Sequence, residues 1–329
     1  MGICKLHRQK VLSTSISWIL LTSIIIIPLF SLIQPSWSQP PWWNESWNFR
    51  KQIIIDHTKV IADIPNFPVL IDIIDPDLKA KAQSDGDDIA FTVDNNNTLN
   101  REIEFYDGNS GRLVAWIQIP LLSSTVDTEL FMYYGNPYAT NQQNASTVWD
   151  TNFAMVQHLE ESGTASRYDS TIKANTGVAF GGIVKSVAGK IDGADVFDGI
   201  NDYVRVNNAP SLNPTSAITI ELWMNAASTG NFINLVNKGT YNQHYLRAGS
   251  GEGSIYWYVK FSDGTAASVE GNTGWKWNTW HHLVATVDTQ ARTIKVYLDG
   301  VEKLSGTFAA GKSIISTTNP LLISDISQR

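Results

Sequence analysis

The sequence predicts an all-β protein built from two β-sandwich domains, on the basis of three observations. Hydrophobic residues make up 43% of the 329 residues and charged residues 17%, which is enough apolar material for sizeable cores. Short β-branched and aromatic runs, separated by turns rich in Gly, Asn and Asp, recur from residue 52 onward. Beyond residue 40 we expect a single short helix, at Leu78–Gln83.

The first 38 residues have the order of a secretory signal peptide. Basic residues precede an apolar stretch from Ile16 to Ile33, and the small residues Ser36 and Ser38 indicate a cleavage site before Gln39. The apolar stretch is also long enough to cross a bilayer, so an uncleaved membrane anchor is the alternative. Both interpretations place the rest of the chain outside the cytoplasm, secreted or at the cell surface, with membrane contact only through the N-terminal segment.

Charge and cysteine content exclude several classes of function. None of the 31 acidic residues precedes Gln39, so the part after the signal segment is strongly acidic, and it has no cluster of Lys or Arg. Such a surface does not suit a nucleic-acid partner, but it does suit divalent cations. The only cysteine is Cys4, so disulfides, Cys-ligated zinc and cysteine nucleophiles are excluded from the rest of the chain.

Residues 42–140 form the first predicted domain, a small β-sandwich. Six β-type runs with turn residues between them fit into fewer than 100 residues: Gln52–Ile55, Pro68–Ile74, Ile89–Val93, Glu102–Tyr106, Arg112–Ile119 and Thr128–Tyr134. Residues 141–149 are polar and are expected to form a linker.

A second β-rich domain is predicted for residues 150–329. Apolar residues alternate clearly along several of its runs, and the clearest strands are Tyr203–Val206, Ile218–Met224, Phe232–Val236, Ile255–Phe261, His282–Val287 and Thr293–Leu298. No internal repeat relates the two domains.

Four motifs in the second domain carry a family resemblance. FDGINDYV at 197–204, TIELW at 219–223, WHHLVAT at 280–286 and VYLDG at 296–300 occur in this order. They resemble the hallmarks of laminin-G-like, concanavalin A-like jelly-roll domains, which implies a jelly roll over residues 150–329. Members of that family continue beyond the segment matching 320–323 into a final strand. The resemblance therefore implies a jelly roll lacking its last strand, with an open strand edge available for self-association.

The first domain resembles a separate family of extracellular domains whose function is uncharacterised. The resemblance rests above all on MYYGNP at 132–137, together with WNFR at 47–50. It implies a surface protein and no known chemistry.

Catalytic patterns are absent from the places where this scaffold would carry them. Jelly-roll glycosidases place acids at alternate positions of one strand, and the second domain has no E-x-D-x-x-E pattern. The nearest match, Glu102, Glu104 and Asp107, lies in the first domain, where we interpret the two glutamates as the solvent side of a strand. His281 and His282 are adjacent and should face opposite sides. We therefore predict no catalytic residues and no enzyme activity.

Calcium is the metal that the sequence favours, with no cofactor strictly required. Asp198, Asn201 and Asp202 supply hard oxygen ligands in a turn that contains glycine. The competing interpretation is a plain turn, because Asp, Asn and Gly also tolerate tight backbone angles.

Aromatic side chains form the candidate carbohydrate site. Tyr256, Tyr258 and Lys260 alternate with apolar residues that we assign to the core, so they should share the open face of one strand. Trp275 and Trp277 lie in a following loop and are added to the site. Sugar rings pack flat on such aromatic rings and hydrogen-bond to neighbouring polar groups.

These patterns predict an adhesin-like protein that binds an extracellular ligand, a glycan or a surface protein. Two alternatives remain open from the sequence. One is a polysaccharide-active glycoside hydrolase or its accessory module, and the other is a structural protein of the cell envelope.

Overall fold

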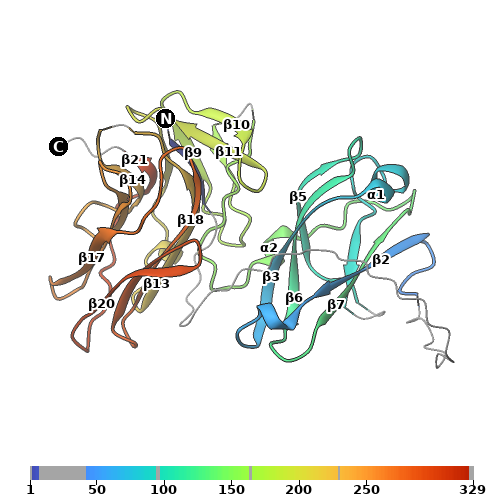
Figure 1. The fold of residues 1–329 in the computed structure, drawn as a ribbon, viewed down its shortest axis with the longest axis horizontal. Helices are drawn as coiled ribbons and strands as arrows, with labels where there is room; N and C mark the ends of the chain where they lie inside the picture. The colour runs from blue at the N-terminus through green and yellow to red at the C-terminus, as the bar shows by residue number, and fades with distance from the viewer. Residues whose placement is uncertain (1, 7–41, 94–96, 163–164, 229, 326–329) are drawn as a thin grey trace. The chain divides into compact units, whose positions relative to one another are not determined.

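The computed structural model describes residues 2–6, 42–93, 97–162, 165–228 and 230–325, which form two compact units (Figure 1). One unit spans Ile16–Val148, and the other comprises Trp149–Arg329 together with Met1–Ser15. The apolar part of the expected signal peptide or anchor lies outside the described residues. Within them, no helix has the length and hydrophobicity needed to cross a bilayer.

The first unit contains two small antiparallel sheets that face each other across one core. One sheet has the order β2 (Phe49–Ile55), β7 (Thr128–Tyr134), β4 (Ala90–Thr92), and the other has the order β3 (Ile64–Ile74), β6 (Arg112–Leu122), β5 (Arg101–Asp107). All six predicted runs lie on these strands. Alternate residues such as Val69 and Ile71 on β3, and Leu130 and Met132 on β7, are buried between the sheets.

Two short helices complete the first unit. The α1 helix (Pro76–Lys81) begins slightly before the predicted position, because the Asp75 side chain accepts a hydrogen bond from the Asp77 amide and Pro76 occupies the first turn. The α2 helix (Ala145–Val148) lies within the segment expected to be a linker, and its Val148 is buried. This segment is therefore partly folded onto the first unit.

The described part of the second unit is a sandwich of two antiparallel sheets. The seven-stranded sheet has the order β10 (Val184–Ala188), β11 (Gly193–Phe197), β1 (Gly2–Leu6), β13 (Ala217–Asn225), β18 (Trp280–Asp288), β19 (Thr293–Leu298), β20 (Val301–Thr307). The eight-stranded sheet has the order β17 (Ala266–Asn272), β16 (Ser254–Lys260), β15 (His244–Ala248), β14 (Ile233–Asn237), β21 (Leu321–Asp325), β12 (Tyr203–Val206), β9 (Gly177–Phe180), β8 (Ser166–Arg167).

The inner faces of the two sheets build one hydrophobic core. Leu222 and Met224 on β13 and Leu283 and Ala285 on β18 face Trp257 and its neighbours on β16. The Trp257 indole N–H donates to the Thr286 carbonyl of the other sheet at 2.9 Å, so this buried polar group is satisfied across the sandwich.

The strand at 321–325, where the sequence predicted an open edge, is paired on both sides. β21 is an interior strand that pairs with both β12 and β14. Gly2–Leu6, assigned from the sequence to the export segment, forms β1 and pairs with both β11 and β13. In the described chain, neither β11 nor β13 presents an unpaired edge at this position.

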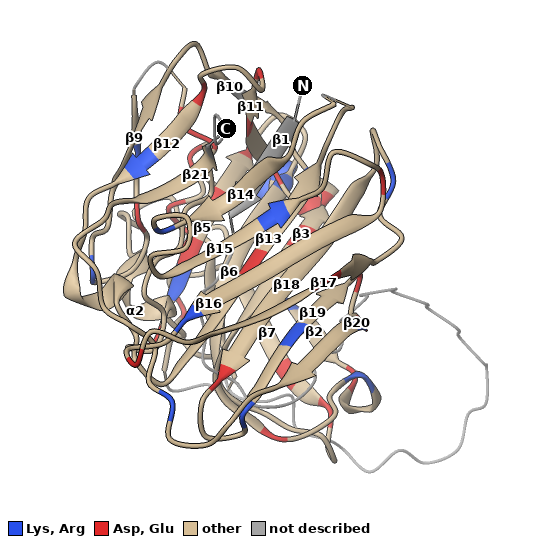
Figure 2. Cartoon of the chain, turned by 90° about the vertical axis from the view of Figure 1, so that its left-hand side faces the viewer, with Lys and Arg blue, Asp and Glu red and all other residues tan. Residues whose placement is uncertain are grey.

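The positions of Lys and Arg (blue) and of Asp and Glu (red) are interspersed along the described ribbon, and this view shows no cluster of blue (Figure 2). The absence of a nucleic-acid partner stays a prediction from the acidic composition.

Candidate ligand-binding face

The β16 strand separates core side chains from outward-facing side chains by simple alternation. Its buried residues are Ile255, Trp257 and Val259, and the half-buried residues between them are Tyr256, Tyr258 and Lys260. Because the side-chain period of a strand is two, these last three residues share the outer face of the eight-stranded sheet.

The neighbouring strand β15 extends this face with residues that the sequence patterns did not indicate. In the antiparallel register Tyr245 lies opposite Tyr258, and Arg247 lies opposite Tyr256. The rings of Tyr245 and Tyr258 stack at 5.1 Å between centroids, and Tyr256 lies 5.4 Å from Tyr245. Cross-strand pairing therefore produces an aromatic surface that no single strand contains.

A fourth tyrosine arrives from the turn between β14 and β15. Tyr241 has a positive φ of 59°, and its ring meets both Tyr245 and Tyr258 edge-on at 5.3 Å. We call Tyr241, Tyr245, Tyr256 and Tyr258 the tyrosine cluster. Tyr241 is 55% exposed, whereas Tyr245 is fully buried beneath its neighbours.

Burial raises the pKa of the Tyr245 and Tyr258 hydroxyls, so both stay protonated at neutral pH. They therefore remain neutral O–H groups that can donate and accept hydrogen bonds.

Polar groups border the tyrosine cluster on both sides. The Arg247 guanidinium lies 4.8 Å from the Tyr245 ring centroid, and its Nε donates to the Asn234 side-chain oxygen at 2.7 Å. Asn234 is fully buried, and its Nδ2 has no hydrogen-bond partner among the described residues. On β17, the exposed Ser268 and Glu270 lie opposite Tyr258 and Tyr256.

The two tryptophans predicted for the same site lie elsewhere. Trp275 is fully buried in the core, and its indole N–H donates to the Ser254 carbonyl at 3.0 Å. Trp277 is half-buried and packs against the same core, with its ring 4.4 Å from that of Trp275. Neither belongs to the outer face that carries the tyrosine cluster. The sequence does not show which side of the sheet this loop covers, so no pattern in it separates these two tryptophans from the tyrosines.

The candidate calcium turn is held together by its own backbone. The Asp198 carboxylate accepts hydrogen bonds from the amides of Ile200 and Asn201, which lowers its pKa. The buried Asp202 carboxylate accepts from the Asp198 and Gly182 amides. These bonds account for the turn, and calcium binding by Asp198, Asn201 and Asp202 stays a prediction.

The adjacent histidines on β18 face different partners, as their spacing requires. The His281 ring lies 2.8 Å from the Asp299 carboxylate, and the His282 ring lies 2.9 Å from the Glu221 carboxylate on β13. The Glu221–His282 pair is largely buried. The two imidazoles are thus hydrogen-bonded separately and do not converge on a common site.

The acids of the first unit differ from expectation in their burial. Glu102 and Glu104 were expected on the solvent side of their strand, yet each is only 8% exposed. A β-bulge shifts the register between Ile103 and Phe105, and the Trp116 indole N–H donates to Glu104 at 2.7 Å. The sequence carried no signal for this bulge.

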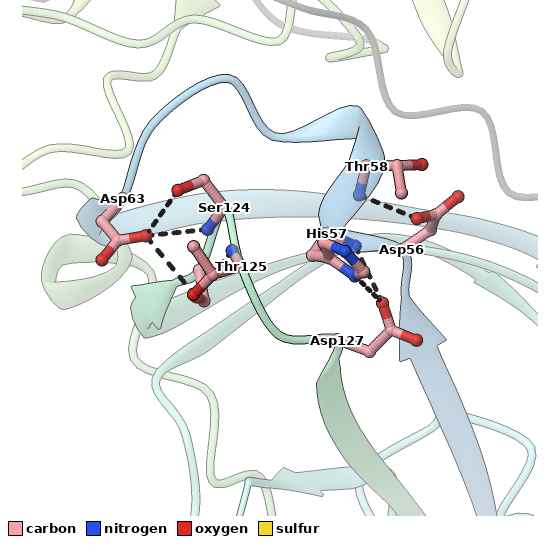
Figure 3. Close-up of polar contacts among 8 residues, drawn as sticks. Asp56, His57, Thr58, Asp63, Ser124, Thr125 and Asp127 are labelled. Carbon is pink, nitrogen blue, oxygen red and sulfur yellow. Dashed lines mark hydrogen bonds and ion pairs between the residues drawn. The ribbon is translucent and has the colours of Figure 1, made fainter.

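A polar group on the first unit has the composition of a metal site (Figure 3). Asp56, His57 and Asp127 bring potential ligand atoms within 4.8 Å of one another. Asp127 accepts from the backbone amide and the ring of His57, which lowers the pKa of its carboxyl, and Asp56 accepts from the Thr58 amide. These exposed carboxylates thus cap and tether a turn.

Comparisons with solved structures return folds at low similarity. The binding domain of Paraclostridial Mosquitocidal Protein 1 is 16% identical with a TM-score of 0.42, and the match covers 53% of this chain and 45% of that one. Domain 4 of an extracellular arabinanase from Geobacillus stearothermophilus, in complex with arabinotriose, is 23% identical with a TM-score of 0.35, covering 47% and 76%. A Bacteroides ovatus protein described as carbohydrate-binding is 11% identical with a TM-score of 0.31, covering 80% and 70%.

The chain therefore spans under half the length of the first of these structures. No curated protein matches the sequence.

Family models match a stretch in each part of the chain. Residues 85–168 match a model described as a domain of unknown function, DUF2341, and residues 197–327 match the concanavalin A-like lectin/glucanases superfamily. Both resemblances drawn from the sequence motifs are confirmed. The chain thus carries a concanavalin A-like lectin/glucanase domain, preceded by a domain of unknown function.

Proposed function

We propose that this chain is an exported, non-catalytic protein that binds a glycan through the outer face of its eight-stranded sheet. The observation that carries the proposal is the tyrosine cluster, in which four rings from two strands and a turn lie side by side. The family match to lectins and glucanases supports a saccharide as the ligand class.

The chemistry of this face suits a sugar. The exposed Tyr241 and the half-buried Tyr258 offer ring surface to the C–H face of a saccharide. Their hydroxyls, the Arg247 guanidinium and the Glu270 carboxylate offer donors and acceptors to sugar hydroxyls.

The test is a glycan array probed with the purified full chain, with and without calcium. For the best ligand, Tyr258→Ala and Tyr241→Ala should each weaken binding at least tenfold by calorimetry. The matched control is Tyr138→Ala, which removes a 90% exposed tyrosine of the first unit and should leave affinity unchanged. Equal affinity in all three variants would place the binding site elsewhere. Loss of binding on chelation would support the calcium turn at Asp198, Asn201 and Asp202.

Export is tested by fractionating the natural host and sequencing the N-terminus of the recovered protein. We expect recovery outside the cytoplasm, either starting at Gln39 or with residues 1–38 retained as an anchor. Recovery of the full chain only from the cytosol would contradict export.

A polysaccharide hydrolase is the second candidate, supported by the buried Glu221–His282 pair. A carboxylate hydrogen-bonded to an imidazole can move protons if a substrate reaches it. Turnover of β-glucans, galactans or chitin that disappears in Glu221→Gln would favour this candidate over the binding protein.

A further inference from the structure

The seven-stranded sheet is continuous only because a segment from the far N-terminus bridges it. β11 pairs with β10 on one side, and β13 pairs with β18 on the other, but β11 and β13 do not pair with each other. Between them lies β1, antiparallel to both, with Ile3 opposite Val196 and Asn225. β11 and β13 therefore lie one strand width apart, and each is also paired on its other side, with β10 and β18 respectively.

Both walls of this gap are supported independently of β1. β13 pairs with β18 along all nine residues from Ala217 to Asn225, and its Leu222 and Met224 are in the core. On β11, Phe197 is also in the core. An emptied gap would leave the N–H and C=O groups of both walls without partners, and such edges readily accept another strand.

The walls also define what the gap accepts. Residues directly opposite in antiparallel strands share a face, so positions opposite Met224 and Leu222 border the core, and the position opposite Trp223 borders the outer face. A suitable occupant is an extended segment with an apolar residue opposite Leu222 and a polar residue opposite Trp223. Opposite Met224 it needs a residue that also fits beside the buried Asp195 of β11. The segment seated there has Cys4, Lys5 and Leu6 in this register.

The connection through the chain does little to hold Gly2–Leu6 in the gap. Residues 7–192 separate it from β11, so pairing it with the gap closes a long loop, which costs chain entropy. The strand also belongs to the segment whose cleavage before Gln39 is part of the proposed export, and cleavage would remove it.

We propose that the gap between β11 and β13 is a strand-acceptor site that binds an extended peptide, with Gly2–Leu6 as its exchangeable occupant. This inference rests on the proposed export, because both cleavage before Gln39 and retention as an anchor separate Gly2–Leu6 from the gap, and it does not rest on the proposed glycan site. Recognition follows the strand-addition mode, in which main-chain hydrogen bonds supply affinity and alternate side chains supply specificity.

The test uses the full chain produced without export, so that residues 1–38 are retained. The double variant Ile3→Pro/Lys5→Pro removes two amide donors and should expel β1. We expect a lower melting temperature than in the parent protein. A labelled peptide of residues 1–8 should bind the variant at one to one and restore the melting temperature, while binding the parent at least tenfold more weakly. The matched control chain, Gln9→Pro/Val11→Pro, should behave like the parent.

A peptide carrying the same two prolines should not bind. An unchanged melting temperature in the double variant, or failure of the unmodified peptide to bind it, would overturn the proposal. If the double variant does not fold, Met224→Cys in the parent supplies a second readout, because Cys4 is the only native cysteine and lies opposite this position. Oxidation should link the two, and excess peptide should compete by forming a mixed disulfide. Failure of either step would overturn the proposal. No glycan is present in these assays, so their outcome is separate from that of the proposed glycan binding.

Discussion

His244 shows how a single buried base can make the second unit sensitive to acid. Its ring is fully buried 5.9 Å from Trp257, and neither ring nitrogen has a hydrogen-bond partner in the described chain. Burial, reinforced by the nearby Lys238 ammonium, lowers the pKa of His244 from 6.5 to about 3. The unfolded chain therefore takes up a proton near pH 6.5, while the folded protein resists it until about pH 3.

The first prediction follows from the sign of this shift. Between those two pH values the unfolded state binds more protons, so stability falls as pH decreases, by about 1.4 kcal/mol per pH unit at most. In His244→Leu this contribution disappears. Urea unfolding at pH 7.0 and pH 5.0 should show a smaller loss of stability in the variant than in the parent, by about 2 kcal/mol. Equal losses in both proteins would mean that His244 is not buried in neutral form.

Arg167 and Asp195 form a buried ion pair in the second unit. Both side chains are fully buried, and the guanidinium donates to the two carboxylate oxygens, Nε at 2.5 Å and a terminal nitrogen at 2.8 Å. The Arg167 guanidinium also lies 3.8 Å from the Glu161 carboxylate, but Asp195 is its fully buried partner, so the pair is sensitive to the removal of either side chain.

The second prediction compares single and double replacements of this pair. Arg167→Met or Asp195→Leu alone should lower the free energy of unfolding by about 3–5 kcal/mol, because a buried charge is left without its partner. The double variant should lose far less than the sum of the two. Denaturant unfolding of the four proteins measures the coupling, and additive losses would contradict the assignment.

At the scale of the element, β16 separates stability from binding within one strand. Trp257 fills the core and reaches Thr286 in the other sheet, whereas Tyr258 packs on the outer face. The third prediction is that Trp257→Ala costs about 3–5 kcal/mol of stability. Tyr258→Ala should cost much less and should affect mainly glycan affinity. Thermal melts and the binding assay on both variants check this, and the reverse pattern would mean that the faces of β16 are exchanged.

The strands that sequence patterns predict are those with a strongly apolar inner face. β13, β18 and β19 were all expected because apolar residues recur at every second position of their sequences. β17 and β20 were not expected, because each is an edge strand with mostly exposed, polar residues. β15 was not expected because its inward-facing side begins with a histidine, His244, and has only Leu246 and Ala248 as apolar residues.

Close approach at these edges also explains two glycines. A Cβ on Gly271 of β17 would lie 2.7 Å from the Leu304 side chain of β20, and a Cβ on Gly306 would lie 3.0 Å from Val269 of β17. The edges of the two sheets therefore meet where glycine leaves room, and this requirement is visible only once the strands are placed.

At the scale of the whole molecule, the two units have separate cores. Leu130 and Met132 belong to the core of the first unit, and Trp257 and Leu283 belong to that of the second. The fourth prediction is that calorimetry of the full chain resolves two unfolding transitions. Leu130→Ala should lower the midpoint temperature of one transition and Trp257→Ala that of the other. Each shift should correspond to a loss of about 2–5 kcal/mol in the free energy of unfolding of that unit, the cost of a core cavity. A single transition shifted by both variants would mean that the units unfold cooperatively.

Local periodicity was sufficient to predict the all-β class, most strands and the shared face of Tyr256, Tyr258 and Lys260, because strand alternation depends only on neighbouring residues. The motifs were likewise sufficient for the family of each part. The rest depends on contacts between distant segments. Register across β14, β15 and β16 adds Tyr241, Tyr245 and Arg247 to the face, while core packing withdraws Trp275 from it. Gly2–Leu6 likewise pairs with two strands some 190 and 220 residues away. Hydrogen bonding between strands depends on how they lie in space, so neither segment alone carries a sequence pattern that predicts the pairing.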